Sequence, residues 1–277
     1  MNYKITTDGI DILDSSEFNI KHILECGQIF RYKVTDFGYT VYSMEHKADV
    51  YCQKGVTKII CKNKKYFVNY FDLDTNYATI KSAISNTPYL KSATEFGYGI
   101  RILRQNSLEM LISFIISANN NIPRIRKAIE HICAHFGTDM GDYFAFPTLE
   151  QLATITEADF VEAGCGYRSK YLVQTIQTLL DGFDLDAIRA MPTREARNLL
   201  IGLSGVGPKV ADCVLLFGYY KTDVFPTDTW IIQAYKAMYG DTTKSVKEIN
   251  KFFTTQFGGY SGFAQQYLFY SKREKTF

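Results

Sequence analysis

The residues most able to do chemistry lie in one segment near the C-terminus, residues 193–219. Its sequence, TREARNLLIGLSGVGPKVADCVLLFGY, predicts an amphipathic helix, a turn at residues 203–208 and a second helix that begins near Lys209. The glycines of the turn can adopt positive φ, and the proline after them suits a first helical turn. The free N–H groups and the helix dipole at this point form an anion site suited to a phosphate of a nucleic-acid backbone. The expected phosphate contacts are Gly205, Val206 and Gly207; a plain turn between two helices is the alternative.

Lys209 and Asp228 are the two side chains with the clearest chemical potential. A lysine in the first turn of a helix is electrostatically disfavoured, so Lys209 is either a contact to a phosphate or an amine that acts as a nucleophile. Asp228 precedes the apolar-periodic segment IIQAYKAMYG, where it is expected to cap a helix. A capping carboxylate is held rigidly by backbone donors, and capping is therefore compatible with a role in catalysis.

The elements that must position these residues change character along the chain. From about residue 19 to residue 72, short β-branched or aromatic runs alternate with turn-forming residues and predict an antiparallel sheet. The predicted strands are FRYKV, YTVYSM, ADVYCQ, TKIICKN and KYFVNYF. After about residue 78 the periodicity is helical, as in SLEMLISFIISA and PRIRKAIEHICAHF. Further helix starts are indicated at Thr148, which has the spacing of a capping box with Gln151, and at Thr193.

The predicted fold is therefore of the α+β class, with an N-terminal antiparallel β-sheet domain followed by a two-part helical region that contains the helix-hairpin-helix. We expect the β domain to span residues 1–95 and the helical region to span residues 96–277. The helix-hairpin-helix falls at about residues 193–219 of that region.

The composition is that of an ordinary folded protein rather than a disordered, collagenous or coiled-coil one. The chain has 277 residues, of which 46% are apolar and 22% charged, and a formal net charge of +2, which leaves room for a local basic groove. The six cysteines form no CxxC pair, and His131 with His135 would supply only two ligands, so we expect no metal site. The N-terminal sequence carries acids where a signal peptide needs an apolar run, which predicts a cytoplasmic protein with free thiols and no targeting signal.

Several segments together resemble a known family. GLSGVGPKVADC followed by FPTDTW is similar to the helix-hairpin-helix DNA glycosylases, in which the hairpin lysine is the nucleophile of the bifunctional members and the later aspartate is the shared catalytic residue. Within that superfamily the chain resembles the 8-oxoguanine DNA glycosylases of the eukaryotic type. The supporting segments are CGQIFRY, ISFIISANNNIPRI, GYRSKY and GFAQQYLFYS, in the family's order.

The resemblance implies a pocket for an extruded 8-oxoguanine. This base differs from guanine by a hydrogen on N7, and the Gly27 carbonyl matches the family position that accepts it. Gln265 matches the residue that binds the Watson–Crick edge, while Phe269 and Cys213 match the two sides of the slot around the ring. The C-terminal helix is thereby expected to return to the base pocket. Without the resemblance, Phe269 and Cys213 would be interpreted as ordinary core residues.

A second set of residues matches the family's contacts to the strand opposite the lesion. Asn119 matches the residue that fills the gap left by the base, and Tyr167 the wedge beside it. Arg124 and Arg168 match the pair that donates to the estranged cytosine, which presents acceptors at O2 and N3. The resemblance therefore implies a preference for 8-oxoguanine opposite cytosine. Arg124 considered alone fits a solvated helix face.

Two positions depart from the family pattern. Ser204 replaces a proline of the hairpin, and Trp230 replaces a histidine that contacts a phosphate near the lesion. Neither change removes a reacting group. An indole N–H can still donate to the phosphate, but it supplies no charge.

The resemblance also implies a mechanism and its partners. Deprotonated Lys209 attacks C1′ of the sugar, Asp228 stabilises the oxocarbenium-like state, and β-elimination from the resulting Schiff base nicks the DNA. No cofactor is required, although a monovalent cation at the hairpin carbonyls is compatible with the family. The expected partner is double-stranded DNA containing 8-oxoguanine, bound by a monomeric, nucleoid-associated enzyme that does not contact membranes. The alternatives are a related glycosylase with another range of oxidised purines or opposite bases, and a DNA-binding module that uses the hairpin only as a phosphate clamp.

Overall fold

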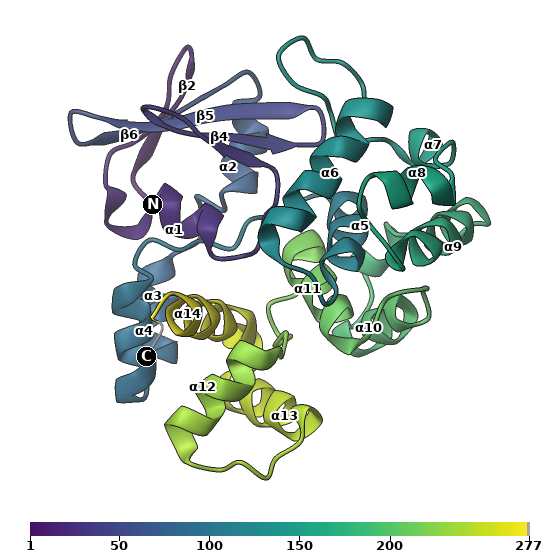
Figure 1. Cartoon of the computed structure of the whole chain (residues 1–277). Helices are drawn as coiled ribbons and strands as arrows, with labels where there is room; N and C mark the ends of the chain where they lie inside the picture. Colours follow the sequence, from purple (N-terminus) through teal and green to yellow (C-terminus); the bar gives the residue numbers. More distant parts are fainter. Residues whose placement is uncertain (276–277) are drawn as a thin grey trace.

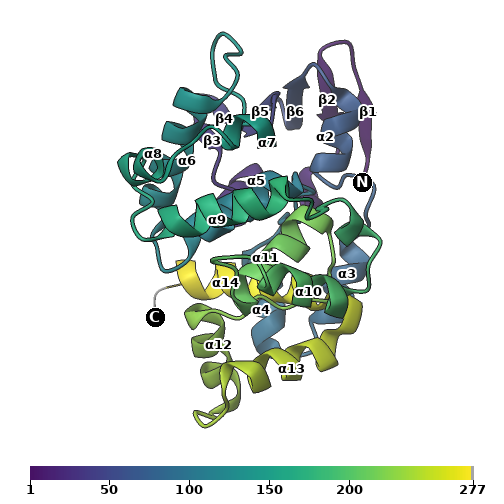
Figure 2. The same cartoon turned by 90° about the vertical axis from the view of Figure 1, so that its right-hand side faces the viewer.

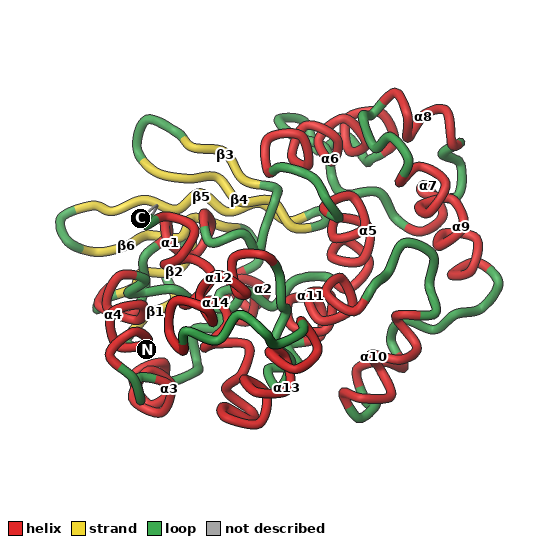
Figure 3. Tube along the Cα trace, turned by 60° about the horizontal axis from the view of Figure 1, so that its bottom comes forward, coloured by secondary structure: helices red, strands yellow, loops and turns green. Residues whose placement is uncertain are grey.

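The N-terminal part of the chain forms a six-stranded antiparallel sheet in the order β1-β2-β6-β5-β4-β3. A computed structural model describes residues 1–275 (Figure 1). The strands are β1 (Tyr3–Ile5), β2 (Gly9–Ile12), β3 (Tyr32–Val34), β4 (Gly38–Ser43), β5 (His46–Gln53) and β6 (Val56–Cys61). One face is covered by α1 (Ile20–Glu25) and α2 (Lys64–Tyr70) and buries the alternating side chains of Ile10, Val41, Val50 and Ile59. Strands therefore gather in a single layer at one side of the molecule, and helices make up the rest (Figure 3).

The sheet differs from the sequence prediction at both ends. The segment KYFVNYF was expected to be a strand, and this prediction is wrong because residues 64–70 form α2. The Asn63 side chain accepts a hydrogen bond from the Tyr66 N–H and caps the start of the helix. Phe67 and Tyr70 are three residues apart, so the helix puts both on its buried face. The prediction also missed β1 and β2, which precede residue 19; β1 pairs with β2, and β2 pairs with β6.

The remaining helices form two groups (Figure 1). The first group, after the sheet, comprises α5 (Ser107–Ser117), α6 (Ile122–Phe136), α7 (Leu149–Leu152), α8 (Glu157–Glu162), α9 (Arg168–Leu180), α10 (Thr193–Ile201) and α11 (Pro208–Tyr219). The second comprises α3 (Tyr77–Ile84), α4 (Pro88–Phe96), α12 (Thr229–Tyr239), α13 (Val246–Phe257) and α14 (Ser261–Glu274). Within these groups α14 packs against α4 and α12, α10 against α11, and α9 against α5 (Figure 2).

The predicted α+β class is confirmed, with the sheet first and the helical region after it. Residues 1–95 contain the whole sheet and also the helices α1 to α3 and most of α4, so the expected boundary at residue 95 stays a prediction. The last two residues of the expected 96–277 region lie outside the described residues. In the part of the chain that the structure describes, we find no helix whose length and apolar character would let it cross a membrane.

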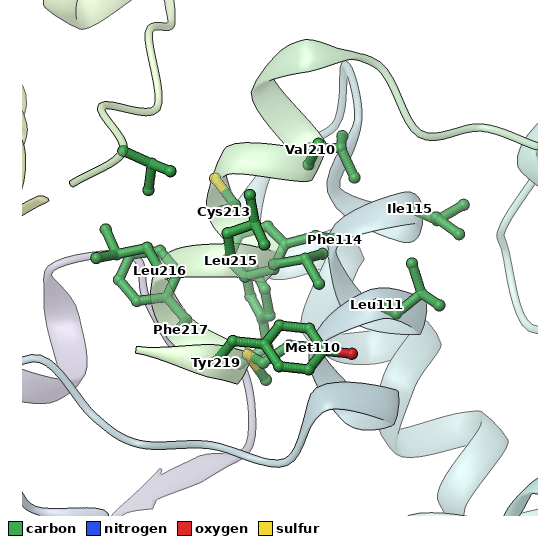
Figure 4. Packing of buried hydrophobic residues seen from close by; sticks show 14 of the residues in the cluster. Met110, Leu111, Phe114, Ile115, Val210, Cys213, Leu215, Leu216, Phe217 and Tyr219 are labelled. Atoms are coloured by element: carbon green, nitrogen blue, oxygen red, sulfur yellow. The ribbon is translucent and has the colours of Figure 1, made fainter. Parts of the chain in front are cut away.

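The largest apolar cluster centres on the contact between α5 and α11 (Figure 4). Phe114 of α5 stacks on Phe217 of α11, with ring centres 5.6 Å apart, and Met110, Leu111 and Val214 are buried in the same cluster. The helices approach closely because residue 218 is glycine, where an added Cβ would lie 3.1 Å from the Ser107 Cα. The core therefore holds α11 rigidly along its length.

Arg101 connects the segment after α2 to the start of the helical region. Its guanidinium, fully buried, donates to the carbonyls of Phe71, Asp72 and Thr75. Its Cζ also lies 4.1 Å from the centre of the Tyr77 ring. A buried cation thus satisfies the acceptors of a loop that makes no regular secondary structure.

We expect Arg101→Met to lower the free energy of unfolding by more than about 3 kcal/mol, because each buried acceptor left without a donor costs about 1–3 kcal/mol. Urea denaturation measures this change. The control is Lys4→Met, which removes an exposed lysine while its partner Asp11 keeps the ion pair with Lys58, and it should cost less than about 1 kcal/mol. An equal decrease in the free energy of unfolding in the two variants would contradict the role assigned to Arg101.

Candidate active site

The hairpin between α10 and α11 is held in place by α9. Gly205 has a φ of +77°, and a Cβ at this position would lie 2.8 Å from the Cβ of Tyr171. The Thr175 hydroxyl donates to the Ser204 carbonyl at 2.8 Å, and the Ser204 hydroxyl donates to Gln174 at 2.6 Å. Ser204, which departs from the family's proline, therefore fixes the turn through a side-chain hydrogen bond to α9.

The start of α11 is open to a ligand. Gly207 is the N-cap residue and Pro208 occupies the first turn, and among the described residues no side chain caps this helix end. The Val206 side chain is buried beneath the turn. Because no side chain occupies the first N–H groups, they are available to an anion such as a phosphate.

Six of the residues predicted from the sequence line one small pocket between α11, α14 and the loop after α1. They are Gly27, Lys209, Cys213, Asp228, Gln265 and Phe269. The pocket also contains residues that the sequence analysis missed, namely Cys26, Phe114, Phe217, Pro226 and Gln266. A larger hollow on the sheet side, near Lys47 and Asp142, contains none of the predicted residues. The small pocket is therefore the candidate active site.

Asp228 caps α12 as predicted, and its carboxylate accepts the Ile231 N–H at 3.0 Å. Burial raises the pKa of this carboxyl above its ordinary value of 3.8, while the Ile231 N–H and the positive charge of Lys209 act in the opposite direction. The Lys209 Nζ lies 5.4 Å from the centre of the Phe114 ring. Burial raises the pKa of the Cys213 thiol to about 11, so Cys213 is a neutral wall of the pocket at pH 7.

A buried polar network links α11 to the segment that carries Asp228. The Asp212 carboxylate accepts Nε of Arg197 at 2.6 Å and Nη2 at 3.1 Å. Asn250 donates to the same carboxylate at 3.3 Å and to the Phe225 carbonyl at 2.7 Å. The sequence analysis missed this network, although an aspartate in an otherwise apolar helix, three residues after Lys209, was a usable signal.

The residues expected to recognise the base lie close together, although they come from opposite ends of the chain. Gly27 has a φ of +81°, and a Cβ there would lie 2.9 Å from Cε1 of Phe269. CGQIFRY is mostly irregular backbone, and only Tyr32 of this segment belongs to β3. The Gln265 Oε1 is buried without a hydrogen-bond partner among the described residues. A buried acceptor without a partner can accept a hydrogen bond from a donor group of a bound ligand.

The residues expected to face the opposite strand gather at a second place, around the loop after α5. Asn119 has a φ of +49° and is exposed, as are Arg124 and Tyr167. Arg168 is buried, and its guanidinium donates to the carbonyls of Ala118 and Asn119, each at 2.7 Å. The loop is thus tied to α9 by the same arginine that the resemblance places at the estranged base. Trp230, half-buried, lies in the first turn of α12.

Two family models match this chain, one in its N-terminal part and one in its helical part. A family model described as "8-oxoguanine DNA glycosylase, N-terminal domain" matches residues 12–111. A model described as "HhH-GPD superfamily base excision DNA repair protein" matches residues 112–257.

Curated relatives are similar over most of their length. The N-glycosylase/DNA lyase OGG1 of Arabidopsis thaliana is 31% identical over 93% of this chain and 78% of that protein. The N-glycosylase/DNA lyase of Saccharomyces cerevisiae is 31% identical over 86% of this chain and 72% of that protein.

A solved structure extends the similarity to the whole fold. The Clostridium acetobutylicum 8-oxoguanine glycosylase/lyase, in complex with double-stranded DNA containing cytosine opposite 8-oxoguanine, superposes with a TM-score of 0.94 at 39% identity, over 100% of this chain and 99% of that one. Its apo form gives a TM-score of 0.90 at 40% identity, over 97% and 98% of the two chains. The chain therefore belongs to the 8-oxoguanine DNA glycosylases of the helix-hairpin-helix superfamily and is a DNA N-glycosylase with DNA lyase activity.

Proposed function

We propose that this enzyme excises 8-oxoguanine from duplex DNA, preferentially opposite cytosine, and nicks the product through a Schiff base on Lys209. The observation that carries the proposal is the single pocket that joins Lys209 and Asp228 to Gly27 and Gln265. An amine and a carboxylate there adjoin an unpaired backbone acceptor and an unpaired amide oxygen. Such a set suits a flipped purine whose sugar lies beside the amine.

Recognition uses the pocket walls. The extruded base stacks between Phe269 and the neutral Cys213 thiol, and its N7–H donates to the Gly27 carbonyl. Guanine has a lone pair at N7, which would face the carbonyl lone pairs and be repelled. The Gln265 amide binds the Watson–Crick edge, where the donors of a purine satisfy its buried Oε1.

Chemistry begins when the deprotonated Lys209 amine forms a bond to C1′ and the C1′–N9 bond breaks, so the bonding electrons leave with the base. The Asp228 carboxylate stabilises the positive charge that develops on the sugar. Ring opening gives the Schiff base, and loss of a C2′ proton then breaks the C3′–O bond on the 3′ side of the lesion. Neither step requires a metal or an organic cofactor.

Binding of DNA uses the open start of α11 and the loop after α5. The N–H groups near Gly205, Val206 and Gly207 hold a backbone phosphate, and the Trp230 indole donates to a second one. A monovalent cation at the hairpin carbonyls would add charge at the same place. Asn119 fills the gap and Tyr167 wedges beside it, while Arg124 and Arg168 bind the estranged cytosine. One protomer suffices for one asymmetric lesion, so the enzyme acts as a monomer. Because its substrate is DNA, it is associated with the nucleoid.

The Schiff base can be tested by borohydride trapping on a duplex with 8-oxoguanine opposite cytosine. We expect a covalent adduct with the wild type and none with Lys209→Gln, because glutamine cannot form an imine. Lys247→Gln, an exposed lysine on α13, is the control and should trap like the wild type. Alkali-labile sites without any adduct would mean that the enzyme works through water, and absence of both would refute 8-oxoguanine as the substrate.

Opposite-base preference is expected to depend on Arg124. The wild type should excise 8-oxoguanine at least about tenfold faster opposite cytosine than opposite adenine, because one good base contact gives about 1–3 kcal/mol of discrimination. Arg124→Ala should reduce this ratio to about threefold or less, while Arg194→Ala, an exposed arginine of α10, should preserve it. Single-turnover rates with the four opposite bases measure the ratio. An unchanged ratio in Arg124→Ala would remove this residue from the recognition of cytosine.

The acid limb of the pH–rate profile should reflect Asp228. Because the ionised carboxylate is the active form and burial raises its pKa, the single-turnover rate should fall as the pH decreases through a value above 3.8. Asp228→Asn retains an oxygen that can cap α12 but carries no charge, so it should lose this limb and at least about a hundredfold in rate. An identical acid limb in the variant would assign it to another group.

A further inference from the structure

The Gly27 carbonyl is exceptional among its neighbours. The carbonyls of Glu25, Cys26 and Gln28 each accept a hydrogen bond from a long side chain of the helical region. Among the described residues, no donor contacts the Gly27 carbonyl. One acceptor therefore stays free in a run of backbone whose other carbonyls are satisfied.

Two of the donors come from α14. The Gln266 Nε2 donates to the Cys26 carbonyl at 2.6 Å, and both atoms are buried. Arg273 donates through Nη2 to the Glu25 carbonyl. These bonds join residues far apart in the sequence and hold the N-terminal side of Gly27 against the helix that also carries Gln265 and Phe269.

The C-terminal side of Gly27 is fixed independently. Gln28 is fully buried; its amide nitrogen donates to the carbonyls of Ile23 and Arg101, each at 2.8 Å, and its side-chain oxygen accepts the Leu103 N–H at 2.9 Å. Gln105 then donates to the Gln28 carbonyl at 2.8 Å. The Gly27 peptide is thus held between two sets of side-chain donors.

Arg273 also contacts the base-stacking ring. Its Cζ lies 5.2 Å from the centre of the Phe269 ring, and a Cβ on Gly27 would lie 3.1 Å from its Nη1. This Nη1 is buried and has no hydrogen-bond partner among the described residues. The guanidinium therefore fills the space behind both the glycine and the ring, although it does not line the pocket.

We propose that Gln266 and Arg273 are positioning residues for lesion recognition, which hold the carbonyls of Cys26 and Glu25 so that the Gly27 carbonyl is aligned with N7–H of the extruded base. The inference rests on the proposed function, because it assumes that Gly27 accepts this hydrogen. A hydrogen bond to N7–H requires a separation of about 2.7–3.2 Å, and the repulsion of guanine requires an equally fixed carbonyl. Cleavage of an existing abasic site needs Lys209 but no base, so it does not depend on this alignment.

The experiment compares two activities of the same variants. Gln266→Leu and Arg273→Met remove the donors while keeping similar side-chain size, and Arg273→Lys keeps the charge and a donor. We expect the first two variants to excise 8-oxoguanine opposite cytosine at least about tenfold more slowly, but to cleave a preformed abasic site within about twofold of the wild-type rate. Arg273→Lys should retain excision within about threefold. Lys272→Met, which removes a charge from the same turn of α14, is the matched control and should leave both rates unchanged.

Binding provides a second readout. In a Lys209→Gln background, the affinity ratio between duplexes with 8-oxoguanine and with guanine opposite cytosine should narrow at least about fivefold in Arg273→Met. Equal losses of excision and abasic-site cleavage, or an unchanged affinity ratio, would overturn the positioning role. If the wild type cleaves abasic sites but does not excise 8-oxoguanine, the proposed function fails together with this inference. If the wild type excises the base and the variants do so equally fast, only the inference fails.

Discussion

The packing of α11 against α5 is the interaction on which the rest of the site depends. From Val210 to Tyr219 the residues of α11 are buried, so the helix cannot shift without disturbing the core. Only its first turn emerges, and this turn carries the open N–H groups and Lys209. The close approach at Gly218 fixes the depth at which that turn meets the pocket. The Lys209 amine is therefore supported by a rigid hydrophobic element rather than by a flexible loop.

The pocket also takes residues from α14 and from irregular segments such as the loop after α1, and long polar side chains hold the irregular segments. Arg101, Arg168, Gln28 and Asn250 donate to backbone carbonyls of loops, while Gln266 and Arg273 donate to carbonyls at the end of α1. Irregular backbone inside a protein must find donors for its carbonyls, and these side chains provide them. In this enzyme the same bonds give the loops near the pocket defined positions. The same hydrogen bonds thus satisfy the backbone carbonyls and fix the geometry of the site.

Electrostatics separate the reacting groups from their surroundings. Burial disfavours the ionised form of Asp228, and the nearby Lys209 charge partly compensates. Asp212, which follows Lys209 by only three residues, is instead engaged by Arg197 and Asn250, which compensate its charge. The two carboxylates thus differ in their electrostatic environment because their partners differ.

Local signals determined a large part of this protein from the sequence. The hairpin turn, the helical periodicity of α6, the capping box at Thr148 and the cap at Asp228 depend on residues close together in the sequence, so their spacing alone predicts them. The roles assigned to Gly27, Gln265 and Phe269 came from resemblance to a family, since spacing cannot bring opposite ends of a chain together. Residues 65–71 were misassigned because an aromatic-rich run fits a strand or a short buried helix equally well until a capping residue is weighed. Only the tertiary structure decided that Gln266, Arg273 and Asn250 support the site. Each donates a hydrogen bond to a backbone carbonyl far away in the sequence, and long-range packing, not the neighbouring sequence, brings the donor and the acceptor together.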